Sequence, residues 1–128
     1  IKIKETEFLA KINHKDKIYI IGSNGKLSNN NFSANELPFI FGKPPIESFL
    51  KFKEIIDQSK FSYDQIENLY FFPSKRWDIK LKNNILIKLS KNFTSESLDN
   101  AHKFLKDFNI NKFIIVDVRI KDKIILNE

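Results

Sequence analysis

The segment that most constrains the fold is residues 76–89, in which apolar and polar residues alternate on both sides of an Asn-Asn pair. Alternation with a period of two is typical of a strand with one buried face, so the segment predicts a β-hairpin. A two-residue loop at positions 83–84 would set Lys80 opposite Ile87 and bring lysine onto the buried face. A three-residue loop at positions 82–84 keeps that face apolar.

The three-residue loop fixes a register for the hairpin. On the buried face it pairs Leu81 with Ile85, Ile79 with Ile87, and Trp77 with Leu89. On the polar face it sets Asp78 opposite Lys88. The last loop residue, Asn84, then needs a positive φ, which Asn tolerates better than most residues other than Gly.

The rest of the chain divides into short strands and two helices. We expect extended chain over Ile1 to Ile12, strands at 18–21, 65–72, 113–120 and 124–126, a turn at 22–25, a buried apolar segment at 37–42, and helices over 46–59 and from Thr94 or Ser95 to Asn109. The apolar stripes of the helices are Ile46, Phe49, Leu50, Ile55 and Ile56 in the first, and Leu98, Ala101, Leu105 and Phe108 in the second. This order predicts an α+β fold, a largely antiparallel sheet with two helices packed on one face.

The C-terminal segment predicts a second hairpin. A loop of Lys121, Asp122 and Lys123 pairs Ile120 with Ile124 and Val118 with Leu126. Residues 124–126 are apolar, contain no proline, and would form an exposed sheet edge of the kind that accepts an added strand. We therefore expect Ile125→Pro to prevent strand addition. The alternative is an ordinary edge strand whose neighbour lies in residues outside this sequence.

The charge of the chain suggests a nucleic-acid partner, but its distribution argues against one. The formal net charge is +6 and the pI is about 9.4, yet the lysines are spread over every segment instead of massed on one element. Lys, Ile, Asn and Phe together supply 67 of the 128 residues, a bias typical of AT-rich genomes. Arginine occurs only at Arg76 and Arg119, so we expect these positions to need a planar, forked guanidinium.

Patterns that carry catalysis or cofactor binding are absent from the sequence. Its three glycines form neither a phosphate-binding loop nor a dinucleotide fingerprint. His14 and His102 have no carboxylate neighbours at metal-ligand spacing, and the acidic residues are dispersed. We expect Asp117 to face the polar side of the sheet or to hold Arg119. No cofactor, metal or catalytic residue is predicted, although a basic nucleic-acid module and a small hydrolase remain as rival interpretations.

Several motifs, in this order and at these spacings, resemble the extracytoplasmic part of the bacterial division protein family FtsQ (DivIB). They are Glu5 through Ala10, the turn at Asn24-Gly25, Leu37-Pro38 with Gly42 downstream, Arg76 through Leu81 with its Asn-Asn turn, and Asp117-Val118-Arg119. Together they span nearly all 128 residues. The Leu-Pro followed by Gly is most like the alphaproteobacterial branch of the family.

The resemblance implies a role in cell division. It makes residues 1–5 the tail of a POTRA domain and residues 6–128 an FtsQ-type β domain. The whole protein would be a single-pass inner-membrane protein, with an upstream span and this part in the periplasm. Such proteins are not enzymes; they are divisome scaffolds that recruit FtsB and FtsL, with a partner strand added to the last strand of the sheet. The partner-binding residues so implied are Arg76, Arg119, Ile120, Lys121, Asp122, Lys123, Ile124, Ile125 and Leu126.

Overall fold

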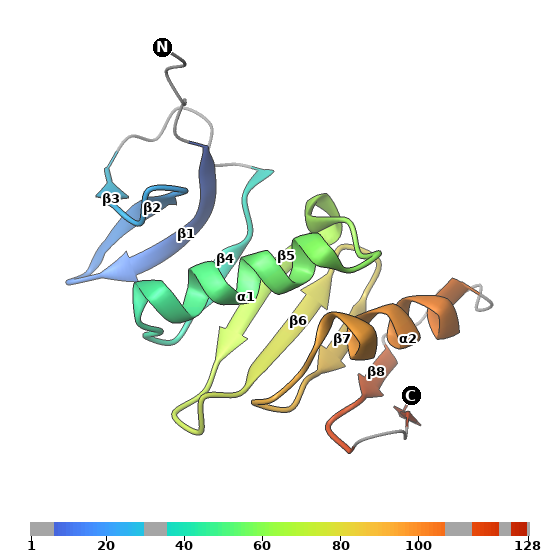
Figure 1. Ribbon diagram of the computed structural model, residues 1–128. Helices are drawn as coiled ribbons and strands as arrows, with labels where there is room; N and C mark the ends of the chain where they lie inside the picture. Colours follow the sequence, from blue (N-terminus) through green and yellow to red (C-terminus); the bar gives the residue numbers. More distant parts are fainter. Residues whose placement is uncertain (1–6, 30–35, 107–113, 121–123, 128) are drawn as a thin grey trace, which may run out of the picture.

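One mixed β-sheet organises the chain, with strand order β3-β2-β1-β4-β5-β6-β7-β8-β9 (Figure 1). This computed structural model describes residues 7–29, 36–106, 114–120 and 124–127. Its strands are β1 (Phe8–His14), β2 (Lys17–Gly22), β3 (Leu27–Ser28), β4 (Phe39–Phe41), β5 (Ile66–Phe71), β6 (Trp77–Leu81), β7 (Ile85–Lys88), β8 (Ile114–Asp117) and β9 (Ile125–Asn127). Its helices are α1 (Ile46–Gln58), the short 3₁₀ helix η2 (Tyr63–Gln65) and α2 (Ser95–Lys106).

The predicted α+β class is confirmed. Five of the eight strand pairings are antiparallel, while β1 with β4, β4 with β5, and β7 with β8 are parallel. Adjacent parallel strands need a crossover connection, and α1 and α2 supply the crossovers from β4 to β5 and from β7 to β8. Two of the three parallel pairings therefore account for the two helices, whereas β1 and β4 are connected through β2 and β3.

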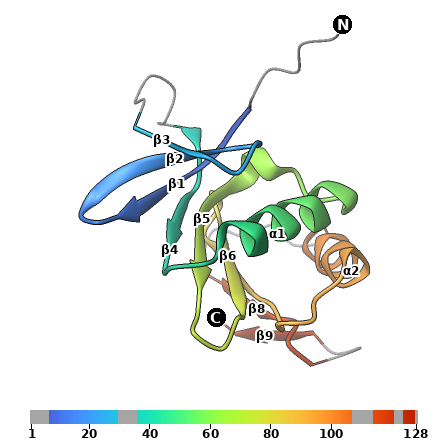
Figure 2. The same ribbon diagram turned by 60° about the vertical axis from the view of Figure 1, so that its left-hand side comes forward.

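Both helices cover the same face of the sheet (Figures 1 and 2). The pairings make β4, β5, β7 and β8 run in one direction, and both crossovers step the same way along the strand order. Crossovers of this kind are almost always right-handed. Two right-handed crossovers with the same direction and step place their helices on one side, and the described residues place no helix on the opposite face.

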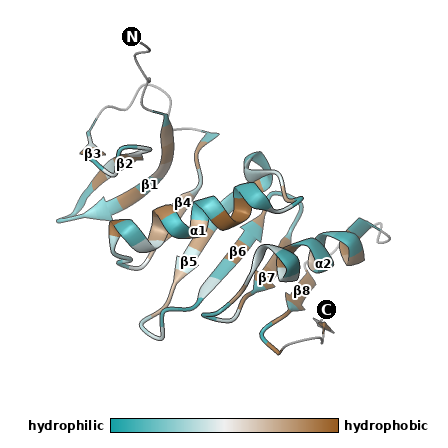
Figure 3. Cartoon of the chain, in the orientation of Figure 1, coloured by the Kyte–Doolittle hydropathy of each residue, from teal (hydrophilic) through white to brown (hydrophobic). Residues whose placement is uncertain are grey.

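Helix α1 begins after Pro45, with Glu47 in its first turn, where a negative charge interacts favourably with the helix dipole. Hydrophobic residues recur along the helix between hydrophilic ones (Figure 3). Phe49, Phe52 and Ile56 are its buried residues. The predicted stripe omitted Phe52, which lies three residues after Phe49 and four before Ile56 and so occupies the centre of the buried face.

Helix α2 begins with a reciprocal pair of side-chain caps. The Ser97 amide donates to Thr94 Oγ1 at 3.2 Å, and the Thr94 amide donates to Ser97 Oγ at 2.9 Å. This is the capping-box arrangement with Ser in place of Glu, and it confirms Thr94 as the cap. Leu98 and Ala101 are buried. The predicted end of the helix, including Phe108 and Asn109, lies outside the described residues.

The central hairpin has the predicted register. Asp78 lies opposite Lys88 and Ile79 opposite Ile87, and the Leu89 amide donates to the Trp77 carbonyl at 3.1 Å. Asn84 has a φ of 68°, as the three-residue loop requires. The predicted turn after β2 is also present, since the Gly25 amide donates to the Gly22 carbonyl at 2.9 Å.

The predicted register of the C-terminal hairpin is wrong. The structure pairs Val116 with Leu126 and Asp117 with Ile125, a shift of two residues from the expected pairing. Strand β8 ends at Asp117, and Ile120 lies outside any strand with 56% of its surface exposed. A shift of two leaves every side chain on its original face, so the apolar alternation could not distinguish the two registers.

The core is one cluster between the helices and the sheet. Trp77, Ile79, Ile87 and Leu89 from the hairpin segment join it, all at most 4% exposed. Tyr63 connects the N-terminal strand β1 to this core, because its hydroxyl donates to the Leu9 carbonyl at 2.6 Å.

None of the helices in the described ranges combines the length and the apolarity needed to cross a membrane.

Candidate partner-binding surface

A row of residues crosses the helix-free face of the sheet in register. Tyr70 on β5 lies opposite Asp78 on β6, Asp78 opposite Lys88 on β7, and Lys88 beside Asp117 on β8. At its β4 end the row continues with Phe41, whose ring stacks on Tyr70 with centroids 5.0 Å apart. The row therefore changes from aromatic to charged residues as it approaches the β9 edge.

Arg76 and Asp78 form the first ion pair of this row. The Arg76 Nη1 donates to Asp78 Oδ1, and the guanidinium also lies over the Phe72 ring at 4.5 Å from its centroid. Asp78 is only 4% exposed. Burial raises the pKa of its carboxyl, and the charges of Arg76 and Lys88 only partly offset that effect.

Asp117 and Arg119 form the second ion pair, with two side-chain hydrogen bonds. Arg119 Nε donates to Asp117 Oδ1 at 2.9 Å and Nη2 donates to Oδ2 at 2.6 Å. The Arg119 backbone amide also donates to Oδ1 at 3.1 Å. These hydrogen bonds lower the pKa of Asp117 despite its burial. The expectation that Asp117 holds Arg119 through a forked guanidinium is thus confirmed.

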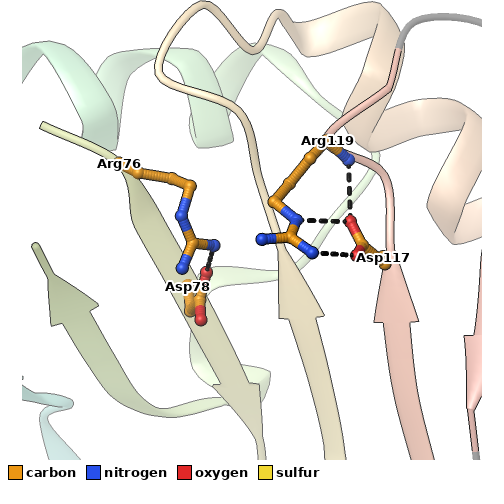
Figure 4. A network of polar contacts seen from close by, with 4 residues as sticks. All are labelled: Arg76, Asp78, Asp117 and Arg119. Atoms are coloured by element: carbon orange, nitrogen blue, oxygen red, sulfur yellow. Dashed lines mark hydrogen bonds and ion pairs between the residues drawn. The ribbon is translucent and has the colours of Figure 1, made fainter. Parts of the chain in front are cut away.

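The two pairs lie side by side on the helix-free face, one beside β6 and the other at the end of β8, with β7 between them (Figure 4). With Lys88 between the two carboxylates in register, the group carries three cations and two anions, a formal charge of +1. The Arg119 side chain is 44% exposed, and two side-chain nitrogens are engaged with Asp117. A guanidinium has five N–H donors, so donors remain that can bind a carboxylate or a backbone carbonyl of a partner.

Strand β9 forms one edge of the sheet, and its backbone directions follow from β8. The Ile114 and Val118 amides donate to carbonyls on the β7 side, so by alternation the backbone groups of Ile115 and Asp117 point to β9. The backbone groups of their partners Asn127 and Ile125 point toward β8. The N–H and C=O of Leu126, which lies between them, are therefore directed away from the sheet. Ile125→Pro would therefore disturb the β8–β9 pairing, and Leu126 is the position that tests the outer edge.

The structure brings some of the predicted partner-binding residues together. Arg119 follows Asp117, which pairs with Ile125, but its guanidinium extends from Asp117 over β7, on the side away from β9 (Figure 4). Ile124 is half-buried and packs against the core. Arg76 adjoins β6, and β7 and β8 separate it from β9. Lys121, Asp122 and Lys123 lie outside the described residues.

Sequence reasoning missed the pairing of Arg76 with Asp78 and assigned Asp78 only to Lys88. The signal was the mirrored spacing of Arg-Trp-Asp and Asp-Val-Arg, because residues i and i+2 of an extended chain share a face. Within the described ranges, no three His, Cys, Asp or Glu residues are grouped so that they could hold a metal. Every buried side-chain nitrogen or oxygen there has a hydrogen-bond partner.

Comparison with known protein families identifies the family of this chain. The sequence model for the C-terminal part of the cell division protein FtsQ/DivIB matches residues 10–119. The chain belongs to the FtsQ/DivIB family. Its role is therefore in cell division, and the resemblance inferred from the sequence motifs is confirmed. Among curated proteins, none is significantly similar to this chain.

The fold of this FtsQ/DivIB-family chain matches a solved structure. That structure is the major extracytoplasmic domain of the trans isomer of DivIB from Geobacillus stearothermophilus, at a TM-score of 0.51 and 10% identity. The match covers 83% of this chain and 90% of the DivIB domain. At this identity the similarity establishes the shared fold, with its mixed sheet and two helices.

Proposed function

We propose that this chain is the extracytoplasmic, non-enzymatic part of a divisome scaffold, and that it binds FtsB and FtsL by pairing a partner strand with β9. Residues 1–5 are the tail of a POTRA domain in this proposal, residues 6–128 form the β domain, and a single upstream span anchors the protein in the inner membrane. The match of family and fold to a division protein's extracytoplasmic domain supports this placement.

The observation that carries the proposal is the outer side of β9. The strand pairs with β8 alone among the described residues, and the Leu126 backbone donor and acceptor point away from the sheet. Exposed edges of this kind promote association unless charges, proline or a covering element protect them. An added strand would gain its affinity from main-chain hydrogen bonds.

Arg119 gives the helix-free face beside this edge a charge preference. Its guanidinium is held by Asp117 on the β7 side of β8 (Figure 4), and its side chain is 44% exposed. A carboxylate on a part of the partner that passes over β8 and β7 would take the remaining donors. Arg76, two strands further in, would reach only a partner that continues across the helix-free face.

The test is a titration of the chain with the periplasmic segments of FtsB and FtsL. Leu126→Pro removes the outward donor of β9 and should lower the affinity at least tenfold. The matched control is Ile18→Pro on β2, at the opposite end of the sheet, because pairing alternation also directs the Ile18 backbone outward. Arg119→Ala and Arg76→Ala measure separately how much each guanidinium contributes to the affinity.

Circular dichroism of each variant establishes that it is folded. A folded Leu126→Pro chain that binds the partners as tightly as the wild type would exclude strand addition at β9. Equal losses from Leu126→Pro and Ile18→Pro would show a general effect on the sheet. Salt-sensitive binding to single-stranded DNA without binding to either segment would replace the proposal with the nucleic-acid interpretation.

A further inference from the structure

A concave site lies at the far end of the sheet from β9, between the β1–β2 turn and the start of α1. The cavity measures about 830 Å³, which falls in the usual range for ligand pockets. Figure 2 shows the β1–β2 hairpin projecting past β4, on the side of the molecule where α1 begins. Nothing in the proposed interaction with FtsB and FtsL uses this region.

The floor of the cavity is apolar. Ile12, Leu27 and Ile46 line it from β1, β3 and α1. Ile12 is 6% exposed and belongs to the core, whereas Leu27 is 37% exposed. The turn at Gly25 is held close to the first turns of α1, since a Cβ there would lie 3.5 Å from Ile46 Cγ2. The floor is thus built by packed elements.

The rim of the cavity is polar and mostly basic. His14, Lys15 and Lys43 line it together with Asp16, and all four side chains are exposed. Among the described residues neither lysine takes part in an ion pair, and His14 meets Tyr19 edge-on at 5.8 Å between ring centroids. The formal charge of the rim is +1 with His14 neutral.

The turn that carries Lys15 has an unusual backbone. Lys15 and Asp16 have φ values of 51° and 65° and form the two-residue loop between His14 and Lys17. Such loops favour Asn and Gly, which adopt positive φ most readily. Lysine at the first position is unfavourable for the backbone, and its side chain lines the cavity. Outliers of this kind concentrate at functional sites.

We infer that this cavity binds an extended peptide in which a bulky apolar side chain lies next to an acidic one. The apolar side chain would fill the floor formed by Ile12, Leu27 and Ile46, and the carboxylate would pair with Lys15 or Lys43. Nucleic acid fits less well, because the lining residues include no Phe, Tyr or Trp on which its bases could stack. A membrane surface would need several protruding apolar side chains, and of the three floor residues only Leu27 is exposed.

The experiment uses the isotope-labelled 128-residue chain and three capped octapeptides. The first is Gly-Ser-Glu-Leu-Phe-Glu-Ser-Gly; the second replaces both Glu residues by Gln, and the third replaces Leu and Phe by Ser. The first peptide should shift the amide signals of residues 12–16 and of Gly42, Lys43 and Ile46 saturably. The other two should each bind at least fivefold more weakly.

Two matched double variants test the rim. Lys15→Glu with Lys43→Glu should weaken binding of the first peptide at least tenfold, whereas Lys51→Glu with Lys91→Glu makes the same charge change on exposed residues outside the cavity and should change it less than twofold. Leu27→Ser tests the floor and should weaken binding at least threefold. The amide spectrum of each variant shows whether it is folded.

Results of three kinds would overturn the inference. One is the absence of amide shifts in residues 12–16 and in Gly42, Lys43 and Ile46 at millimolar peptide. Another is equal binding of the Glu and Gln peptides, or equal losses from the two double variants. The third is a response of the same amides to phosphatidylglycerol vesicles but not to the peptide, which would assign the region to a membrane surface.

Discussion

Phe52 of α1 stacks on Trp77 of β6, with ring centroids 4.4 Å apart and ring planes 16° from parallel. Phe49 and Phe71 also contact the indole, at centroid distances of 6.3 and 4.9 Å. Trp77 is 4% exposed. The indole therefore packs between the first helix and the central hairpin, and it supplies a large part of the apolar surface buried between them.

Trp77→Ala should lower the free energy of unfolding by about 3 to 5 kcal/mol, because it removes a large buried aromatic group and leaves a cavity. Trp77→Phe keeps part of the packing and should lose less. Urea unfolding of the three proteins gives the comparison. A loss below about 1 kcal/mol for the alanine variant would contradict the buried position of the indole.

Asn84 provides a test of the loop in the hairpin. Because its φ is 68°, Asn84→Gly should be neutral or slightly stabilising. Asn84→Val should lower the free energy of unfolding by about 1 to 2 kcal/mol, since a β-branched residue is disfavoured in this region. Thermal unfolding midpoints measure both. Equal midpoints for the Gly and Val variants would be inconsistent with a strained residue at this position.

Local patterning was sufficient to predict the hairpin and both helices. In the hairpin, turn chemistry and face alternation pointed to the same register, because a shift of one residue would have exposed its apolar side chains. In the final strand the competing registers differed by two residues. The alternation of apolar and polar residues is the same in both registers. The pairing of Asp117 with Ile125 therefore could not be derived from the sequence pattern alone.

The candidate binding surface was predictable only in part. The scarcity of arginine indicated that positions 76 and 119 need a planar, forked guanidinium. Arg119 does bind Asp117 through two side-chain hydrogen bonds. That the two ion pairs lie side by side follows from the parallel pairing of β7 with β8. This pairing depends on a crossover through α2, and residue spacing alone does not specify which strand lies next to which.

Gly42 should tolerate substitution worse than Gly25. Gly42 has a φ of 101°, and a Cβ there would lie 2.3 Å from the Phe71 carbonyl oxygen. Gly25 has a φ of 79°, but its Cβ would meet only side-chain atoms at 3.5 Å. Gly25→Ala should lower the free energy of unfolding by about 1 to 2 kcal/mol from backbone strain, and Gly42→Ala by more, because the backbone must also move. Chemical denaturation that ranks the two in the opposite order would show that β4 is not held against β5 as described.

The two aspartates of the charged row should respond to pH in opposite ways. The pKa of Asp117 is lowered in the folded chain by its hydrogen bonds to Arg119. Its contribution to stability is therefore present above the unfolded value of about 3.9 and is lost as the pH falls through the lower folded value. The pKa of Asp78 is raised, chiefly by burial. Protonation of Asp78 therefore favours the folded state, and its ionised form opposes folding above the raised pKa.

Asp117→Asn should consequently destabilise the chain by about 1 kcal/mol at pH 7, a value reduced by the solvent exposure of Arg119. This difference from wild type should shrink below about pH 4 and disappear in stronger acid, where the wild-type carboxyl is also protonated. Asp78→Asn should be less destabilising at pH 7 than Asp117→Asn, because the neutral amide avoids the desolvation of a buried carboxylate even though it loses charge pairing with Arg76. Urea unfolding from pH 3 to pH 8 measures both series. A destabilisation by Asp117→Asn that stays constant over this range would show that the carboxylate charge does not hold Arg119 in place.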